Sequence, residues 1–549
     1  MTDFSFNNRE KIKTELSYPQ FDLIIIGGGI TGAGIALDAA SRGLKTALVE
    51  KNDFAFGTSS RSTKLIHGGL RYLKQFEFGL VKEVGSERAI LHKLAPHLVV
   101  PEKMLLPLYE KKGMGYWLTS IGLKVYDILA GVKKEDQRRM LTKLYTLKYE
   151  PLLQHDVKGG AIYAEYRTDD ARLTIEIMKT AVQHGATVLN YASVKEFVYS
   201  DSKISGVAVE DQLSHETFSV NGKVVVSATG PWVDELRELN KSKQGKRLHL
   251  TKGVHIVFPR EKLPVAQAIY FDVEDGRMIF AIPRGRTTYV GTTDTNYQGS
   301  KDNVVTTYED AHYLVKAVNA MFPSVNVKME DIESSWAGLR PLIHEEGKSA
   351  SELSRKDEIF ESSTGLISIA GGKLTGYRKM AERVVDLVIE EHFEARDFKS
   401  CFTEKIKFEA SKFANVKEVK QYTNTVFQKL KLSGFSELTS RYLVENFGVQ
   451  TDLILKQYDL RSAHEHPELS LLKAELWFCI QYEMVTGLQD FFMRRIGIVN
   501  FDIHRVITWK HEIANECKSL LNWSDDKMIA ELKSLEELIF SVQNFKDIA

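Results

Sequence analysis

Three glycines near the N-terminus have the spacing of a loop that binds a diphosphate. They are Gly27, Gly29 and Gly32, with Ile30 and Thr31 between the last two. In such a loop the first glycine allows a tight turn, the second lets the backbone approach a pyrophosphate, and the third lets a helix pack closely on a strand. The helix N-terminus offers free N–H groups and partial positive charge to the phosphates. We therefore predict that this loop and its first helical residues bind a dinucleotide.

Glu50 stands 23 residues after Gly27, where a dinucleotide site needs an acid. It follows the short apolar run 46–49, and a carboxylate at the end of a second strand accepts hydrogen bonds from ribose hydroxyls. The same carboxylate repels a 2′-phosphate, so NADP is not expected. A lone glycine pattern is also typical of ordinary glycine-rich turns. Here an apolar strand at 21–26, the loop, a helix at 33–42, a second strand and the acid occur in order, which favours dinucleotide binding.

A hydroxyl-rich stretch follows the acid. Residues 57–64 read GTSSRSTK, with five hydroxyls and two cations, and residues 67–72 read HGGLRY. Clusters of Ser and Thr usually form solvated loops. The small glycines beside polar groups favour close approach to a ring and an anion instead. The predicted cofactor-binding residues in this region are Thr58, Ser59, Ser60, Ser62, Thr63, Lys64, His67, Gly68 and Gly69.

Two further apolar strands, at 224–226 and 367–370, also end in glycine-containing turns. In a doubly wound sheet such strand ends converge on one crevice at the carboxyl edge. The choice between FAD and NAD is open from the glycine loop alone, but a long cofactor lying across the sheet would use all three turns. The residues predicted to contact it there are Thr229, Gly230, Gly372, Lys373, Leu374 and Thr375.

The remaining pattern predicts an α/β fold with three parts. The first is a doubly wound, Rossmann-like domain that binds the cofactor. Alternating strands at 254–258, 278–282 and 288–290 predict an antiparallel sheet, which we assign to a substrate domain. After about residue 398 the sequence is helix-like. We therefore predict an interleaved cofactor and substrate unit at 1–397 and a C-terminal helical domain at 398–549.

The composition excludes several classes of protein. The 549 residues include 73 Lys and Arg and 73 Asp and Glu, and a balanced charge argues against nucleic-acid binding. Hydrophobic residues at 43% and charged residues at 27% exclude wholesale disorder. The three cysteines, Cys401, Cys479 and Cys517, form neither a disulfide framework nor a C-x-x-C metal motif, so we predict no metal site and a reducing cytoplasm.

The N-terminus lacks a secretory signal, and no uncharged apolar run is long enough to span a membrane. Residues 114–131 contain aromatic residues, are interrupted by Lys124 and Asp127, and are flanked by lysines. Two interpretations stay open. This segment is either an amphipathic helix on an anionic membrane surface or a helix that packs on its own protein with its lysines in solvent.

Long motifs now support a resemblance over nearly the whole chain. They read GGGITGAGIALDAASRG, GTSSRSTKLIHGGLRYL, EYRTDDARL, ATGPWVD, GTTDT, ESSWAGLRPL, SRKDEIF, AGGKLTGYRKMAE and, in the helical tail, DFFMRR. The sequence resembles the FAD-dependent (aerobic) glycerol-3-phosphate dehydrogenases. The resemblance implies non-covalent FAD and oxidation of sn-glycerol 3-phosphate to dihydroxyacetone phosphate. Electrons then pass to a membrane quinone, or to oxygen in the related oxidases.

The resemblance also implies roles for individual residues. Arg340, Arg71 and Tyr72 match positions that grip the phosphate and glycerol, and an arginine fork suits phosphate oxygens. Arg355 is a further matching cation, with a solvated charge cluster as the alternative. Lys373 is expected either to face negative charge on the reduced flavin or to touch substrate phosphate beside Thr375. His255 is our candidate for the base that removes the hydroxyl proton, with His67 as its rival, because imidazole accepts protons near neutral pH.

Alternatives to this function remain. The oxidase relatives carry an inserted segment that is not obvious here, which favours the quinone-linked dehydrogenase over an oxidase that makes hydrogen peroxide. A non-catalytic flavin-binding module is a second alternative. An amino acid oxidase is disfavoured because several cations match a phosphate-bearing substrate. We expect a cytoplasmic protein on the inner face of the cell membrane, with a quinone, an anionic membrane surface and a second copy in a homodimer as partners.

Overall fold

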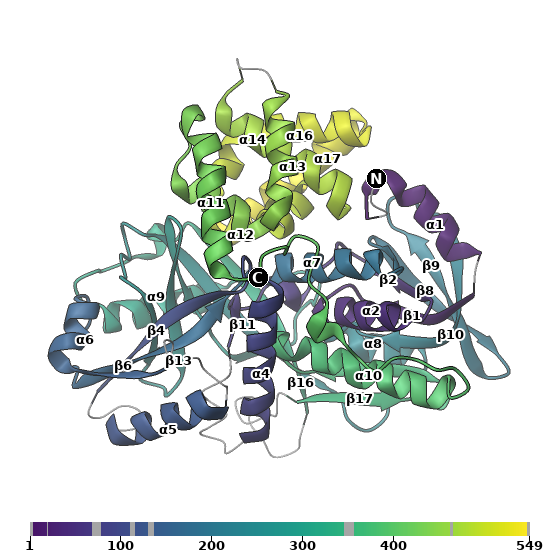
Figure 1. Ribbon diagram of the computed structural model, residues 1–549, viewed down its shortest axis with the longest axis horizontal. Helices are drawn as coiled ribbons and strands as arrows, with labels where there is room; N and C mark the ends of the chain where they lie inside the picture. Colours follow the sequence, from purple (N-terminus) through teal and green to yellow (C-terminus); the bar gives the residue numbers. More distant parts are fainter. Residues whose placement is uncertain are drawn as a thin grey trace.

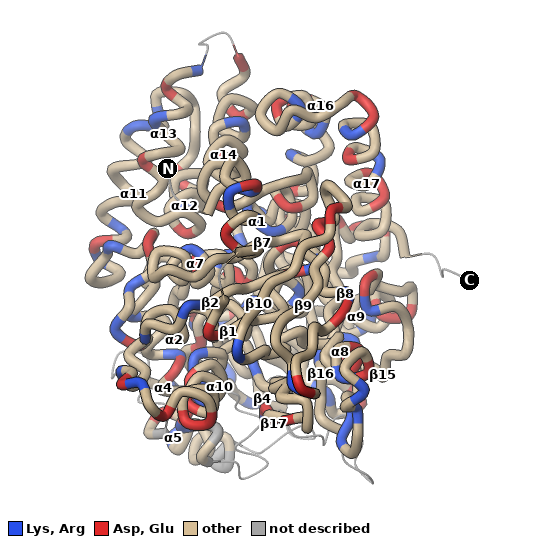
Figure 2. Tube along the Cα trace, turned by 90° about the vertical axis from the view of Figure 1, so that its right-hand side faces the viewer, with Lys and Arg blue, Asp and Glu red and all other residues tan. Residues whose placement is uncertain are grey.

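The computed structural model describes residues 4–18, 20–67, 78–109, 116–129, 137–344, 356–461 and 465–545. Two β-sheets lie beside each other, and the C-terminal helices gather above them (Figure 1). Acidic and basic residues are interspersed along the elements in the view of Figure 2, as expected for equal numbers of each.

The first sheet has the predicted doubly wound core. Its path runs β17 (Asp357–Glu361), β18 (Leu366–Gly371), β10 (Thr217–Ser227), β1 (Gln20–Ile26), β2 (Thr46–Val49) and β7 (Thr187–Leu189), with the hairpin β8 (Ala192–Ser200) and β9 (Lys203–Asp211) attached to β10. The strands β18, β10, β1, β2 and β7 are parallel neighbours. Residues 21–26 are all buried, which explains why this strand is a continuous apolar run rather than an alternating one.

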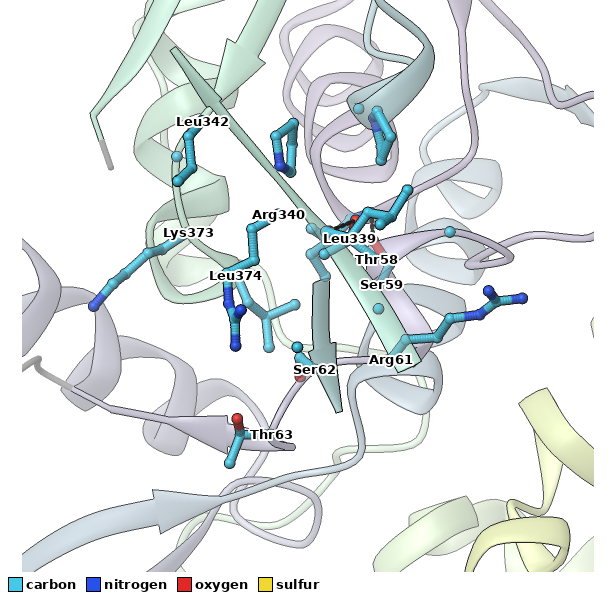
Figure 3. A pocket seen from close by; sticks show the side chains of 18 of the residues that line it. Thr58, Ser59, Arg61, Ser62, Thr63, Leu339, Arg340, Leu342, Lys373 and Leu374 are labelled. Atoms are coloured by element: carbon cyan, nitrogen blue, oxygen red, sulfur yellow. Dashed lines mark hydrogen bonds between the residues drawn. The ribbon is translucent and has the colours of Figure 1, made fainter. Parts of the chain in front are cut away.

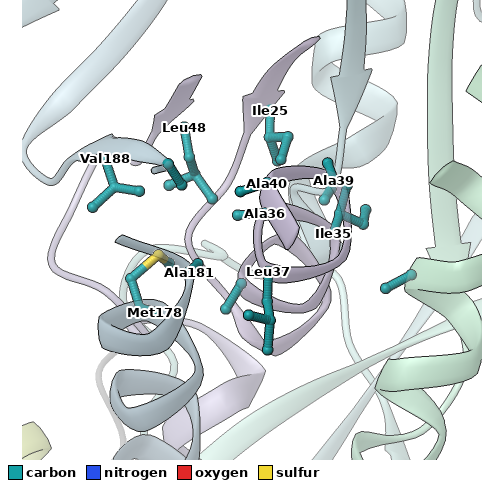
Figure 4. Close-up of a cluster of buried hydrophobic side chains, with 14 of the residues drawn as sticks. Ile25, Ile35, Ala36, Leu37, Ala39, Ala40, Leu48, Met178, Ala181 and Val188 are labelled. Carbon is teal, nitrogen blue, oxygen red and sulfur yellow. The ribbon is translucent and has the colours of Figure 1, made fainter. Parts of the chain in front are cut away.

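Helices cover the parallel strands closely. Helix α2 (Ile30–Arg42) lies between α7 (Asp170–Gln183) and α10 (Tyr377–His392), and its alanines let it approach the sheet. Figure 4 shows α2 against the strands that carry Ile25 and Leu48, with Met178 of α7 beside it. Gly43 ends α2 in the left-handed region, at φ 99°, as the sequence predicts for a C-cap. The first βαβ unit is thereby confirmed.

The second sheet is larger than the three predicted strands. Its path runs β15 (Thr295–Asn296), β11 (Leu248–Pro259), β14 (Thr287–Gly291), β13 (Met278–Arg284), β12 (Ala268–Asp272), β4 (Val100–Leu108), β6 (Gly159–Arg167) and β3 (Leu65–Ile66), with β16 (Ser334–Ile343) on β11 and β5 (Arg139–Thr142) on β6. All its pairs are antiparallel except β12 with β4. The pairing of β11 with β16 sets Thr251 opposite Arg340 and His255 opposite Trp336. This register positions the residues of the site.

Helices outside the parallel sheet complete the interleaved unit. They are α1 (Arg9–Ser17), α4 (Phe78–Leu94), α5 (Tyr116–Leu129), α6 (Lys143–Tyr149), α8 (Val233–Leu239) and α9 (Tyr308–Met321). None of the helices in the described part of the chain is both long enough and apolar enough to cross a membrane.

The part after β18 that the structure describes contains helices and no strand, which confirms the C-terminal helical domain. Its elements are α11 (Val416–Leu430), α12 (Glu437–Phe447), α13 (Thr451–Asp459), α14 (Pro467–Glu483), a π-helical turn (Asp490–Arg495), α15 (Ile498–Phe501), α16 (Ile503–Leu521) and α17 (Asp525–Gln543). These helices bury an apolar core of their own.

Candidate active site

A cavity of about 1250 Å³ opens where the carboxyl ends of the parallel strands meet the second sheet. It brings together most of the predicted site residues from segments far apart in the sequence. Those that line it are Gly27, Gly29, Ile30, Thr31, Glu50, Thr58, Ser59, Ser62, Thr63, His67, Thr229, Gly230, His255, Arg340, Gly372, Lys373, Leu374 and Thr375.

The glycine loop has the geometry of a diphosphate cradle. Gly27 has φ 110°, and a Cβ built on it would lie 2.7 Å from the carbonyl oxygen of Ala228. A Cβ on Gly32 would lie 1.9 Å from the Gly27 carbonyl oxygen, so helix and loop pack too closely for any side chain there. Gly32 therefore lies behind the cavity wall and shapes the loop. The Ser59 hydroxyl accepts a hydrogen bond from the Ile30 N–H at 2.9 Å and so fixes the start of α2.

Glu50 is held at the end of β2 by two backbone donors. The N–H groups of Gly28 and Asn52 donate to its two carboxylate oxygens at 2.6 and 2.8 Å. Burial raises the pKa of Glu50, and the two N–H groups oppose that shift. Each carboxylate oxygen has a second lone pair, so the carboxylate is oriented and still able to accept ribose hydroxyls.

Two residues of the hydroxyl-rich stretch do not face the cavity. The Lys64 ammonium forms buried ion pairs with Asp170 at 2.5 Å and Asp169 at 3.5 Å. The Ser60 hydroxyl is buried and lies 3.4 Å from the Gly57 carbonyl oxygen. The structure therefore does not bring Lys64 and Ser60 to the cavity with the other predicted residues, because their polar atoms have partners within the protein.

Arg340 projects into the other part of the cavity from β16. Its guanidinium donates to Thr292 Oγ1 at 2.8 Å, to the Thr293 carbonyl at 3.2 Å and to Asp294 at 3.1 Å. A Cβ on Gly253 would lie 2.2 Å from an Arg340 nitrogen, so the glycine makes room for this side chain. Figure 3 shows Arg340 beside Leu374 and directed towards Ser62 and Thr63, whereas Lys373 extends away from it.

His255 lies in the wall next to Arg340. Its Nε2 is 3.0 Å from Thr63 Oγ1, and its ring stacks on Trp336 with centroids 4.8 Å apart. Burial, followed by the positive charges of Arg340 and Lys64, holds the pKa of His255 well below its usual value. The imidazole is therefore neutral, as a general base requires. His67 also lines the cavity, edge-on to Phe280 at 6.3 Å, so both candidate bases stay open.

Some predicted residues lie outside the described part of the chain, namely Gly68, Gly69, Arg71, Tyr72 and Arg355, together with residues 114–115 and 130–131 of the amphipathic segment. The structure also adds residues that the sequence analysis missed. Phe56, Arg61 and Trp232 line the cavity close to the glycine loop. Arg61 belongs to the motif GTSSRSTKLIHGGLRYL and Trp232 to the motif ATGPWVD, so their position beside predicted ligands is the signal that could have identified them.

The chain matches two protein families. Residues 22–378 match the family described as FAD dependent oxidoreductase. Residues 401–528 match the family described as the C-terminal domain of alpha-glycerophosphate oxidase.

Two bacterial relatives align with this chain over nearly the full length of both proteins. The aerobic glycerol-3-phosphate dehydrogenase of Bacillus subtilis is 49% identical over 98% of both chains. That of Staphylococcus aureus is 48% identical over 98% of this chain and 97% of the relative.

Solved structures agree with these matches. The X-ray structure of the glycerol-3-phosphate dehydrogenase from Bacillus halodurans complexed with FAD has a TM-score of 0.85 and 42% identity over all of both chains. The L-alpha-glycerophosphate oxidase of Mycoplasma pneumoniae, at 18% identity and a TM-score of 0.55, covers 70% of this chain and 96% of its own and shares the fold. The chain belongs to the FAD-dependent oxidoreductases and, within them, to the aerobic glycerol-3-phosphate dehydrogenase family.

Proposed function

We propose that this chain oxidises sn-glycerol 3-phosphate to dihydroxyacetone phosphate with FAD as the hydride acceptor. The observation that carries the proposal is that one cavity is lined by the glycine loop, by Arg340 and by the neutral His255. Relatives named as glycerol-3-phosphate dehydrogenases, which align over nearly the full length of this chain, support it. A non-catalytic module would not need a cation and a buried neutral base in the same cavity as the cofactor loop.

The residues present fit FAD and a phosphate-bearing alcohol. The glycine loop, the start of α2 and Glu50 would hold the diphosphate and ribose. Bound FAD supplies the acceptor for the hydride that leaves C2. Arg340 would pair with the substrate phosphate through a charge-assisted fork. A neutral imidazole, His255 or His67, would take the C2 hydroxyl proton in the same step.

The pH dependence of flavin reduction tests His255 as the base. Because its pKa lies well below 6.5, its imidazole stays neutral from about pH 8 to about pH 6. We expect the limiting rate of anaerobic flavin reduction to change less than about twofold over that range, and His255→Asn to lower it by about 10²- to 10⁴-fold. Stopped-flow absorbance measures both. Normal reduction in His255→Asn, with His67→Asn impaired, would assign the role to His67.

We also propose a quinone as the electron acceptor and an anionic membrane as the surface that delivers it. Helix α5 supports this, since Thr119, Gly122 and Leu123 line the cavity while Ile121 and Ile128 are 60% and 70% exposed. An apolar molecule in the membrane would thus have a short route to the cavity.

Helix α6, which like α5 contacts β6, also exposes apolar side chains. Leu144 and Tyr145 of α6 are 76% and 49% exposed; Lys143 and Lys148 are exposed on the same helix, and Lys124 is exposed on α5. Exposed apolar side chains together with lysines suit an anionic bilayer surface. Under this proposal the protein lies on the inner face of the cell membrane; the homodimer stays a prediction.

Quinone-loaded anionic vesicles test this acceptor. We expect Ile121→Glu/Ile128→Glu to lower quinone reduction by about tenfold or more, because burying one Ile contributes about 1.5–3 kcal/mol. Anaerobic flavin bleaching by glycerol 3-phosphate should be unchanged. Leu432→Glu, at an 89% exposed site on the helical domain, is the matched control and should keep full turnover. If oxygen reoxidises the flavin without a quinone and one hydrogen peroxide forms for each flavin reoxidised, the oxidase would replace the quinone proposal.

A further inference from the structure

Arg61 is a cation at the cavity wall that forms no ion pair within the part of the chain that the structure describes, although Asp302 is near enough to oppose the lowering of its pKa. Arg61 is one of the residues that line the cavity, and its Nε is buried with no hydrogen-bond partner in the part of the chain that the structure describes. Burial, followed by the positive charge of Arg494, lowers the pKa of Arg61 to about 10, so it still carries its proton at neutral pH. Arg61 is half-buried, and an unpaired charge that is partly removed from water costs free energy unless a ligand compensates it.

A second arginine lies close to Arg61. Its guanidinium lies 5.2 Å from the centre of the Phe56 ring, and that of Arg494 lies 5.7 Å from the same ring. Arg494 is already neutralised by Asp53 and Asp490, each at 2.6 Å. Arg61 is therefore the surplus positive charge of this pair.

The nearby lysines of the same segment cannot serve instead. Lys64 is bound to Asp170. Lys51 pairs with Asp302 at 2.7 Å and lies over the Trp232 ring. Arg61 is thus the cation that this region, as far as the structure describes it, leaves available for a ligand.

The glycine loop keeps few donors for the diphosphate. The Gly27 N–H donates to the Val49 carbonyl at 2.9 Å, the Gly28 N–H to Glu50 and the Ile30 N–H to Ser59. Three of the N–H groups around the loop are therefore used inside the protein. A diphosphate that carries two negative charges then needs a cation beside the remaining donors.

Arg61 belongs to the segment that packs against this loop. It follows the short helix Thr58–Ser60, whose Ser59 contacts the first turn of α2. Figure 3 shows Arg61 pointing away from Arg340. We propose that Arg61 binds the diphosphate of FAD and makes the cavity select FAD over flavins that lack a diphosphate. Its planar fork matches two phosphate oxygens.

Flavin titration of the full-length chain, freed of bound flavin, tests this assignment by fluorescence quenching. We expect Arg61→Met to weaken FAD binding by about 10- to 100-fold and Arg61→Lys by less, because charge-assisted hydrogen bonds are lost. Riboflavin, which has no phosphate, should bind both variants as it binds the wild type. The FAD dissociation constant of the wild type should also rise more steeply with KCl than that of Arg61→Met.

Arg277→Met is the matched control, since Arg277 lines the cavity but pairs with Asp275. It should change FAD affinity by less than about threefold. Equal loss of FAD and riboflavin binding in Arg61→Met would indicate a structural role and overturn the assignment, as would unchanged FAD affinity. If Arg61→Met does not fold, Arg61→Lys takes its place: its FAD and riboflavin affinities, and the salt dependence of its FAD affinity, are compared with those of the wild type.

Discussion

Arg340→Met should lower kcat/KM for glycerol 3-phosphate by about 10²- to 10³-fold, mainly through a higher KM. The arginine is expected to give the phosphate dianion two charge-assisted hydrogen bonds, each contributing about 1.5–3 kcal/mol. In the variant, the dianion must leave water for a cavity wall without that cation. Initial rates with an artificial acceptor, together with anaerobic titration of flavin bleaching, separate KM from kcat.

Arg340→Lys keeps the charge but loses the fork, so it should recover part of the activity. Arg286→Met is the matched control, because Arg286 pairs with Glu333 on the same sheet and does not line the cavity. Arg340 also contacts Thr292, Thr293 and Asp294, so flavin absorbance and thermal unfolding must stay near those of the wild type. Unchanged kinetics in Arg340→Met would remove it from the phosphate role.

The elements that hold the cofactor could be predicted from local sequence. The run at 21–26 is buried over its whole length, and the glycines at 27, 29 and 32 follow it directly. Strand, loop and helix are adjacent in the chain, so pattern and spacing are enough to predict them. The end of β2 before Glu50 was predicted correctly for the same reason.

Contacts between distant segments could not be predicted in this way. Lys64 was predicted to contact the cofactor because it ends the hydroxyl-rich stretch. Its actual partner, Asp170, stands more than a hundred positions later in the sequence, so local pattern could not reveal the pair. Strand β16 was missed, although its pairing with β11 sets Trp336 against His255. The resemblance pointed to His255, whereas its depressed pKa comes from burial and from Arg340 and Lys64, which stand far from it in the sequence. The partner of Lys64, the position of β16 and the pKa of His255 all depend on contacts between segments that are far apart in the sequence.

Asp53 is one of the buried carboxylates through which the helical domain is fastened to the cofactor side; Glu483, paired with Arg172 and Lys179 of α7, is another. Asp53, three residues after Glu50, accepts from Arg494 at 2.6 Å and from two nitrogens of Arg495 at 2.8 Å. Asn190 also donates to it at 3.2 Å. The Asp53 segment is tied to the glycine loop, because the Ala55 N–H donates to the Gly28 carbonyl at 3.0 Å. The DFFMRR turn of the tail therefore braces the loop that carries Glu50.

Asp53→Asn should destabilise the protein by about 3–5 kcal/mol, because it leaves two buried arginines without their shared carboxylate. Burial raises the pKa of Asp53, but the charges of Arg495 and Arg494 outweigh it and lower that pKa to about 2. An aspartate lowered from about 3.9 stabilises the fold above about pH 4 and loses this effect as the pH falls towards 2. The gap in melting temperature between wild type and variant should therefore narrow over that range.

Asp302→Asn is the matched control, since it removes the exposed partner of Lys51 and should cost about 1 kcal/mol or less. Differential scanning fluorimetry with flavin release as a second signal measures both variants. If the brace acts on the cofactor loop, Asp53→Asn releases FAD before the helical domain melts, whereas Asp302→Asn releases it only on global unfolding. Loss of stability without early FAD release would mean that the DFFMRR turn holds the two domains together but does not act on the cofactor loop.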